Sequence, residues 1–176
     1  MKIRVLFLCV LLFSCMPYSA AFGVKLFDKD SYSSILKRYQ GKSFVLALWS
    51  VDCHPCQQEL QLLGKLHTQV PEVPIVLISV DGAVVNHVME SILRKYALTT
   101  VDQWVFSGTD PAVLRFQIDP AWYGDIPRTY LINAHGERKT IIGATDCRKV
   151  INWVQQRNNK YELGGICDDP AENINH

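Results

Sequence analysis

Two cysteines separated by two residues carry the clearest chemical signal in this 176-residue chain. Cys53 and Cys56 lie in the segment WSVDCHPC, between an apolar run and a segment with helical periodicity. A CxxC pair at the start of a helix can close a disulfide without moving the backbone, and the helix dipole stabilises the thiolate of the first cysteine. Because the thiolate is the attacking species in thiol–disulfide exchange, we expect Cys53 to be the nucleophile and Cys56 to be the resolving thiol.

Three other uses of this cysteine pair compete with redox chemistry. The pair could be a structural disulfide, or it could supply two of the four ligands that a zinc site needs. Zinc is disfavoured because Cys147 and Cys167 are too far apart in the sequence to form a second close pair. A copper carrier would need a third ligand, for which His54 and His87 are candidates. We predict a redox pair with no metal and no other cofactor.

The apolar pattern predicts an α/β domain around the motif. Strands buried on both faces are expected at residues 43–49, 73–80 and 128–133, and shorter strands at 101–106 and 138–142. Helical spacing of apolar residues predicts helices at residues 31–39, 53–70, 84–96, 111–116 and 147–159. A turn is expected at Asp81-Gly82, and the last two strands are close enough to form an antiparallel hairpin. The expected fold is a mixed sheet flanked by helices.

These pieces together resemble the thioredoxin-like superfamily, and within it the exported thiol–disulfide oxidoreductases of the TlpA and ResA type. The resemblance covers about residues 27–159. It rests on WSVDCHPC followed by Glu59, on ISVD at residues 78–81, and on IPRTYLIN at residues 126–133 followed by Gly136. It implies a thioredoxin-like fold and disulfide exchange with a protein substrate.

The resemblance also implies roles for residues near the motif. Pro127 would be a cis-proline facing the cysteines, with Ile126 offering its backbone to a substrate; the alternative is an ordinary trans-proline that opens a strand. Glu59 would lie under the disulfide and tune or relay its proton, unless it is only a solvated helix carboxylate. Thioredoxin itself has a buried aspartate in the strand before the motif, and Ala47 stands at that position here.

Aromatic residues and one histidine flank the predicted site. A protonated His54 would stabilise the Cys53 thiolate and make the disulfide more oxidising, whereas a neutral, exposed His54 would do little. Trp122 and Tyr123 either form an apolar rim for a protein substrate or pack in the core. The predicted substrate-binding residues are Trp49, which is also expected to pack beside the disulfide, His54, Ile126 and Pro127.

The second cysteine pair flanks the last predicted helix. In an oxidising compartment Cys147 and Cys167 are predicted to form a structural disulfide, worth about 3 kcal/mol by loop entropy. The chain would have to retrace the helix in an almost extended form. A shorter helix, an intermolecular bond and a redox relay to the CxxC are therefore kept as alternatives.

The N-terminus has the order of a secretory signal peptide. Lys2 and Arg4 precede an apolar stretch at residues 5–13, and small residues lead to an expected cleavage after Ala21. The alternatives are a lipoprotein box ending at Cys15, which would anchor the protein to a membrane, and an uncleaved anchor. We expect export to a periplasmic or other extracytoplasmic compartment, a thioredoxin-like domain at residues 22–163 and a loose, polar tail at residues 164–176.

Composition limits the function further. Residues are 48% hydrophobic and 20% charged, which is typical of a globular protein, and the net charge of +1 comes with no long basic run that would bind nucleic acid. We predict a monomeric exported thiol–disulfide oxidoreductase. The resemblance implies a protein-disulfide reductant, for example of apocytochrome c cysteines during cytochrome c maturation or of a copper-site thiol, with a membrane electron donor as partner. An oxidant or isomerase of folding proteins is the alternative.

Overall fold

The central strands are buried over most of their length, and both faces of the sheet that they form are covered. β2 (Phe44–Trp49) and β5 (Arg128–Ile132) are buried at every position, and β3 (Ile75–Gly82) is buried over its first five residues. These elements belong to a computed structural model that describes residues 23–83, 86–156 and 164–167. The three strands that were predicted to be buried on both faces therefore form the interior of the fold.

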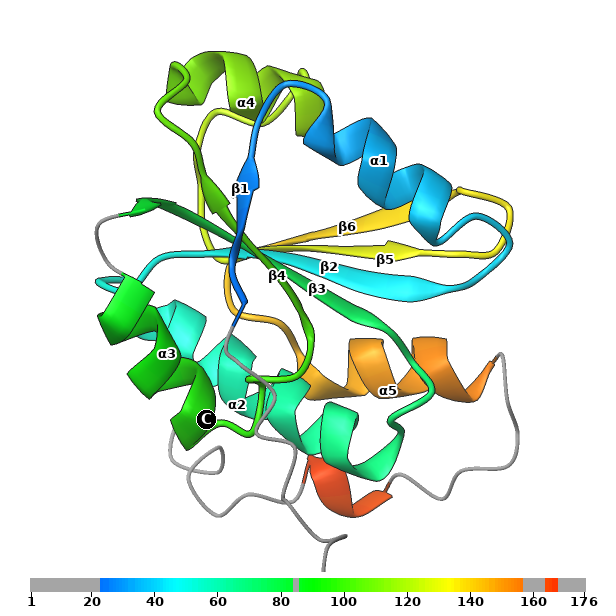
Figure 1. Ribbon diagram of the computed structural model, residues 1–176. Coiled ribbons are helices and arrows are strands. Elements are labelled where there is room, and N and C mark those ends of the chain that lie inside the picture. The colour runs from blue at the N-terminus through cyan, green and yellow to red at the C-terminus, as the bar shows by residue number, and fades with distance from the viewer. Residues whose placement is uncertain (1–22, 84–85, 157–163, 168–176) are drawn as a thin grey trace, which may run out of the picture.

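Six strands form one mixed sheet in the order β1-β4-β3-β2-β5-β6 (Figure 1). The outer strands are β1 (Lys25–Phe27), β4 (Asp102–Phe106) and β6 (Arg138–Ile142). β1, β4, β3 and β2 are parallel, whereas β5 is antiparallel to both β2 and β6. This confirms the predicted mixed sheet and the hairpin formed by its last two strands.

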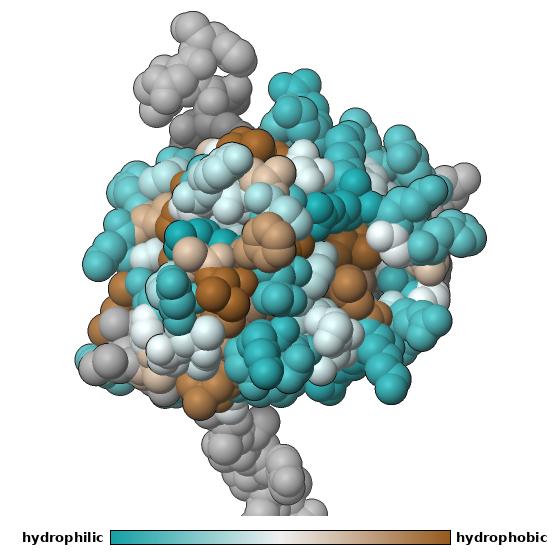
Figure 2. All heavy atoms as spheres, turned by 90° about the horizontal axis from the view of Figure 1, so that it is seen from above, coloured by the Kyte–Doolittle hydropathy of each residue, from teal (hydrophilic) through white to brown (hydrophobic). Residues whose placement is uncertain are grey.

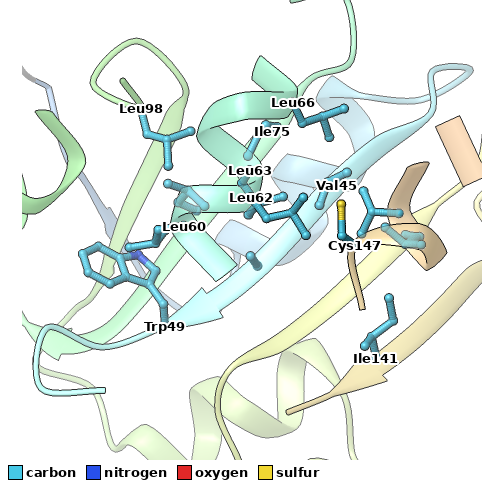
Figure 3. Close-up of a cluster of buried hydrophobic side chains, with 14 of the residues drawn as sticks. Val45, Trp49, Leu60, Leu62, Leu63, Leu66, Ile75, Leu98, Ile141 and Cys147 are labelled. Carbon is cyan, nitrogen blue, oxygen red and sulfur yellow. The ribbon is translucent and has the colours of Figure 1, made fainter. Parts of the chain in front are cut away.

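Helices cover the two faces of the sheet unequally (Figure 1). α1 (Ser31–Arg38) and α4 (Pro111–Ile118) lie on one face. The other face carries α2 (His54–Gln69), α3 (Asn86–Lys95), α5 (Cys147–Gln155) and the short 3₁₀ helix η2 (Gly164–Ile166). We call the apolar cluster on that face the α2-side core; it includes Trp49, Cys56, Leu60, Leu63 and Cys147 (Figure 3).

One strand was missed, and two local predictions were wrong. β1 was not predicted, because three residues are too few for a strand pattern; it pairs in parallel with β4, and Lys25 Nζ lies 2.6 Å from Asp102 Oδ1. Asp81-Gly82 is the end of β3 rather than a turn, because Gly82 still pairs with Phe106. The tail is not loose throughout, since Ile166 in η2 is 2% exposed and packs in the α2-side core.

Helix ends differ from the predictions by a few residues. α5 ends at Gln155, which shortens the predicted helix, and α4 continues to Ile118. The predicted signal peptide with its possible lipobox at Cys15, and the tail from residue 168 onward, lie outside the described residues. Of the helices that are described, none is long and apolar enough to cross a membrane.

Candidate active site

The two cysteines of the CxxC form a disulfide at the start of α2 and differ in exposure. Their Cα atoms are 5.2 Å apart. Cys53 is the N-cap of α2 and is partly exposed, whereas Cys56 is fully buried. The backbone N–H of Cys56 donates to Cys53 Sγ at 3.2 Å. Because this donor and the helix dipole both favour negative charge on Cys53, Cys53 is the sulfur suited to attack and Cys56 the sheltered one.

The proline loop lies at the same end of the sheet as the CxxC. The β2–β5 register pairs Leu48 with Arg128, so the preceding Pro127 lies beside the end of β2, from which the chain continues to Cys53. The Ile126–Pro127 peptide bond is cis. Cys53 and Ile126 both pack against the α2-side core. The structure therefore brings together the cysteines and the proline loop.

Glu59 is a buried residue of α2, one turn after Cys56. The residue is 3% exposed, and its carboxylate accepts hydrogen bonds from Thr129 Oγ1 at 2.7 Å and from the backbone N–H of Thr145 at 3.0 Å. Burial raises the pKa of Glu59, an effect that these hydrogen bonds oppose but do not cancel. The alternative of a solvated helix carboxylate is thus wrong.

The pKa of Glu59 makes the stability of the protein depend on pH. Because the folded pKa is raised, the proton stabilises the folded state fully below the unfolded value of about 4.3, and this stabilisation is lost as pH rises through the folded pKa. We expect Glu59→Gln to remove that dependence. Each unit of the pKa increase contributes about 1.4 kcal/mol.

Urea unfolding of both proteins between pH 4 and pH 9 measures this difference. The free energy of unfolding of the wild type, relative to that of Glu59→Gln, should fall as pH rises. Parallel pH profiles for the two proteins would contradict the buried, proton-binding role of Glu59.

Asp81 holds the loop that leads into the CxxC. Its two carboxylate oxygens accept from Ser50 Oγ at 2.8 Å and from the backbone N–H of Val51 at 2.9 Å. Ser79 Oγ also donates to Asp81, at 2.7 Å. Asp81 was not predicted to belong to the site, although its place at the end of the strand after the motif was a usable signal.

Of the four predicted substrate-binding residues, two reach the surface and two are buried. His54 is exposed in the first turn of α2, and Ile126 is partly exposed. Pro127 is buried, and Trp49 is 1% exposed, where it lies among the side chains of the α2-side core (Figure 3). The prediction that the Trp49 side chain contacts substrate is wrong, because the side chain is enclosed; its predicted packing role near the disulfide agrees with this position.

The remaining candidates, two aromatic residues and one histidine, differ in exposure. Trp122 is 3% exposed and packs in the core, while its neighbour Tyr123 is 90% exposed. His87 is exposed on α3. Within residues 23–83, 86–156 and 164–167, no three His, Cys, Asp or Glu side chains are grouped to hold a metal ion.

Cys147 and Cys167 form a second disulfide, with Cα atoms 5.7 Å apart. Cys147 is the first residue of α5 and is 5% exposed, and Cys167 directly follows η2. Both pack in or against the α2-side core. The bond therefore joins the start of α5 to η2, which lies against α2.

Sequence relatives of the chain are thiol–disulfide oxidoreductases. No family model matches the sequence. ResA of Geobacillus kaustophilus is 25% identical over 120 residues, which are 68% of this chain and 65% of the relative. ResA of Oceanobacillus iheyensis is 28% identical over 117 residues, 65% of this chain and 56% of the relative. The chain thus spans between 56% and 65% of the length of these curated relatives.

Solved structures share the fold at low identity. A secreted disulfide oxidoreductase of Mycobacterium tuberculosis, homologous to E. coli DsbE, matches with a TM-score of 0.54 and 21% identity over 68% of this chain and 85% of that one. A DsbF homologue of Corynebacterium diphtheriae matches with a TM-score of 0.55 and 15% identity, over 69% and 75% of the two chains. The chain thus has a thioredoxin-like fold, as these solved structures do, and is similar in sequence to the ResA thiol–disulfide oxidoreductases.

Proposed function

We propose that this protein is a thiol–disulfide oxidoreductase that exchanges disulfides with other proteins through Cys53 and Cys56. The observation that carries the proposal is the unequal pair at the start of α2, with a partly exposed Cys53 that accepts a backbone hydrogen bond and a fully buried Cys56. The ResA relatives support the same chemistry. A structural disulfide would not need one sulfur to be accessible at a helix N-terminus.

In the reducing direction the reaction has two steps. The Cys53 thiolate attacks one sulfur of a substrate disulfide, forms a mixed disulfide and releases the other substrate sulfur as a thiolate. Cys56 then loses its proton and attacks Cys53 Sγ, which releases the second substrate sulfur and leaves Cys53–Cys56 oxidised. The substrate gains two electrons and the protein loses two. Glu59, whose raised pKa favours proton binding, is proposed to take up the Cys56 proton.

His54 and Ile126 are proposed to contact the substrate directly, since both reach the surface, His54 directly after Cys53 and Ile126 on the proline loop. Pro127, which is buried, is proposed to shape the loop from which the Ile126 backbone pairs with an extended substrate.

The direction proposed for this protein is reduction of protein disulfides, as the resemblance to the TlpA and ResA type implies. We also propose that the protein is exported to a periplasmic or other extracytoplasmic location, which the similarity to a secreted Mycobacterium tuberculosis protein supports. A membrane electron donor and a monomeric state are proposed as well. A role in cytochrome c maturation belongs to the same proposal, and export with cleavage after Ala21 is proposed ahead of its alternative, a lipid anchor at Cys15.

Equilibration of Cys53–Cys56 against dithiothreitol or glutathione buffers tests the direction of electron flow. The readout is alkylation of free thiols in the chain cleaved after Ala21, which lacks Cys9 and Cys15, with Cys147→Ala/Cys167→Ala as background so that only one pair titrates. We expect a reduction potential near that of thioredoxin, about −270 mV. A potential near that of DsbA, about −120 mV, would contradict a reductant and indicate an oxidant of folding proteins.

A further inference from the structure

The segment between α4 and β5, residues 119–125, leads directly into the proline loop. Figure 1 shows the chain descending from α4 to the end of the sheet from which α2 begins. The pairing of Leu48 with Arg128 places β5 and the chain before it at that same end. Tyr123 is three residues before Ile126, so their Cα atoms are at most about 11 Å apart. Tyr123 therefore lies within reach of a polypeptide bound along the proline loop.

A buried guanidinium fixes both ends of this segment. Arg128 is 5% exposed; its Nη2 lies 3.0 Å from Asp119 Oδ2, and its Nη1 lies 2.8 Å from Asp125 Oδ2. Tyr130 Oη donates to Asp119 at 3.1 Å, and Arg138 Nη2 lies 3.1 Å from the other Asp119 oxygen. Two acidic residues six positions apart are thus held by the residue that follows Pro127. The segment is organised before any substrate binds.

Two adjacent aromatic side chains of this segment differ sharply in exposure. Trp122 is enclosed, and its Nε1 donates to the carbonyl oxygen of Asp125 at 2.8 Å. Tyr123 is 90% exposed, more than any other large hydrophobic residue in the described part of the chain. An aromatic side chain on a pre-organised loop gains contact area at a low entropic cost, which is why tyrosine is frequent among the residues that dominate binding energy.

We propose that Tyr123 is a specificity residue that packs against an apolar side chain next to the reacting cysteine of an extended polypeptide substrate. This inference rests on the proposed function, since it assigns a substrate class to the same site. Figure 2, which looks down on the α4 end of the molecule, shows apolar side chains in separate patches among hydrophilic ones.

A pair of peptide disulfides tests the proposal. The two peptides differ only in the residue next to the cysteine, which is phenylalanine in one and serine in the other. We expect the wild type to prefer the phenylalanine peptide in kcat/KM. Tyr123→Ala should lower that preference about tenfold, which corresponds to about 1.4 kcal/mol.

Phe116→Ala is the matched control, because Phe116 is a second exposed aromatic residue, 62% exposed on α4. The control should keep the wild-type preference. Equal preference ratios in Tyr123→Ala and the wild type would overturn the inference, as would the same loss in Phe116→Ala. A wild type that exchanges with neither peptide nor with glutathione disulfide would instead overturn the proposed function.

Discussion

Cys53→Ser should abolish thiol–disulfide exchange, with a loss of at least about a thousandfold in rate. Serine has almost the same size as cysteine, but its hydroxyl group cannot form a thiolate. Cys56 cannot replace the nucleophile because it is fully buried. Turnover of a peptide disulfide, with dithiothreitol as the source of electrons, measures the loss.

Ser50→Ala serves as the control for that measurement. It changes the same loop and removes one hydrogen bond to Asp81, but the hydrogen bond from Val51 to Asp81 remains. This variant should keep most of the wild-type rate. Retention of more than about a tenth of the wild-type rate by Cys53→Ser would show that another group carries the reaction.

Removal of the second disulfide should destabilise the fold and leave exchange in place. Cys147 and Cys167 are 20 residues apart in sequence, and closing a loop of this length stabilises a protein by about 3 kcal/mol. The bond also holds η2, with its buried Ile166, against α2. We therefore expect Cys147→Ala/Cys167→Ala to lower the free energy of unfolding by about 3 kcal/mol, measured by urea unfolding.

The exchange rate of the same double variant separates a structural role from a redox relay. A structural disulfide predicts a rate close to the wild-type value at a temperature where the variant is folded. A variant with unchanged stability and a greatly reduced rate would contradict the structural role and favour a relay to Cys53–Cys56.

The fold could be predicted from the sequence where the apolar signal is long or continuous. β2 and α2 were predicted within one residue at each end, because a six-residue buried strand and a sixteen-residue helix carry many apolar positions. β1 has only three residues and pairs with Trp104, Val105 and Phe106, far away in the sequence. The pairing of β1 with β4 forms only when the chain folds, so the local sequence pattern could not predict β1.

The site could be predicted where residue spacing alone defines the chemistry. Cys53 and Cys56 follow from the CxxC, and Glu59 lies one turn later on the same helix. The partners of Glu59 could not be predicted, since Thr129 and Thr145 are 70 and 86 residues away.

The ion pairs near the proline loop could not be predicted from the local sequence pattern either. In the sequence, Asp119 and Asp125 are indistinguishable from other acidic loop residues. Only in the folded chain do both form salt bridges with Arg128. The enclosure of Trp49 has the same origin, because side chains of α2 and β2 join in one core only when the helix packs on the sheet.

Trapping a mixed disulfide tests the central claim most directly. Reduced Cys56→Ser should attack a peptide disulfide through Cys53 but cannot complete the second step. Intact-mass spectrometry should therefore detect one peptide bound to the protein, and peptide mapping should place it on Cys53. If Cys56→Ser forms no adduct, or if the adduct forms equally in Cys53→Ser/Cys56→Ser, the exchange mechanism proposed for Cys53 and Cys56 is contradicted.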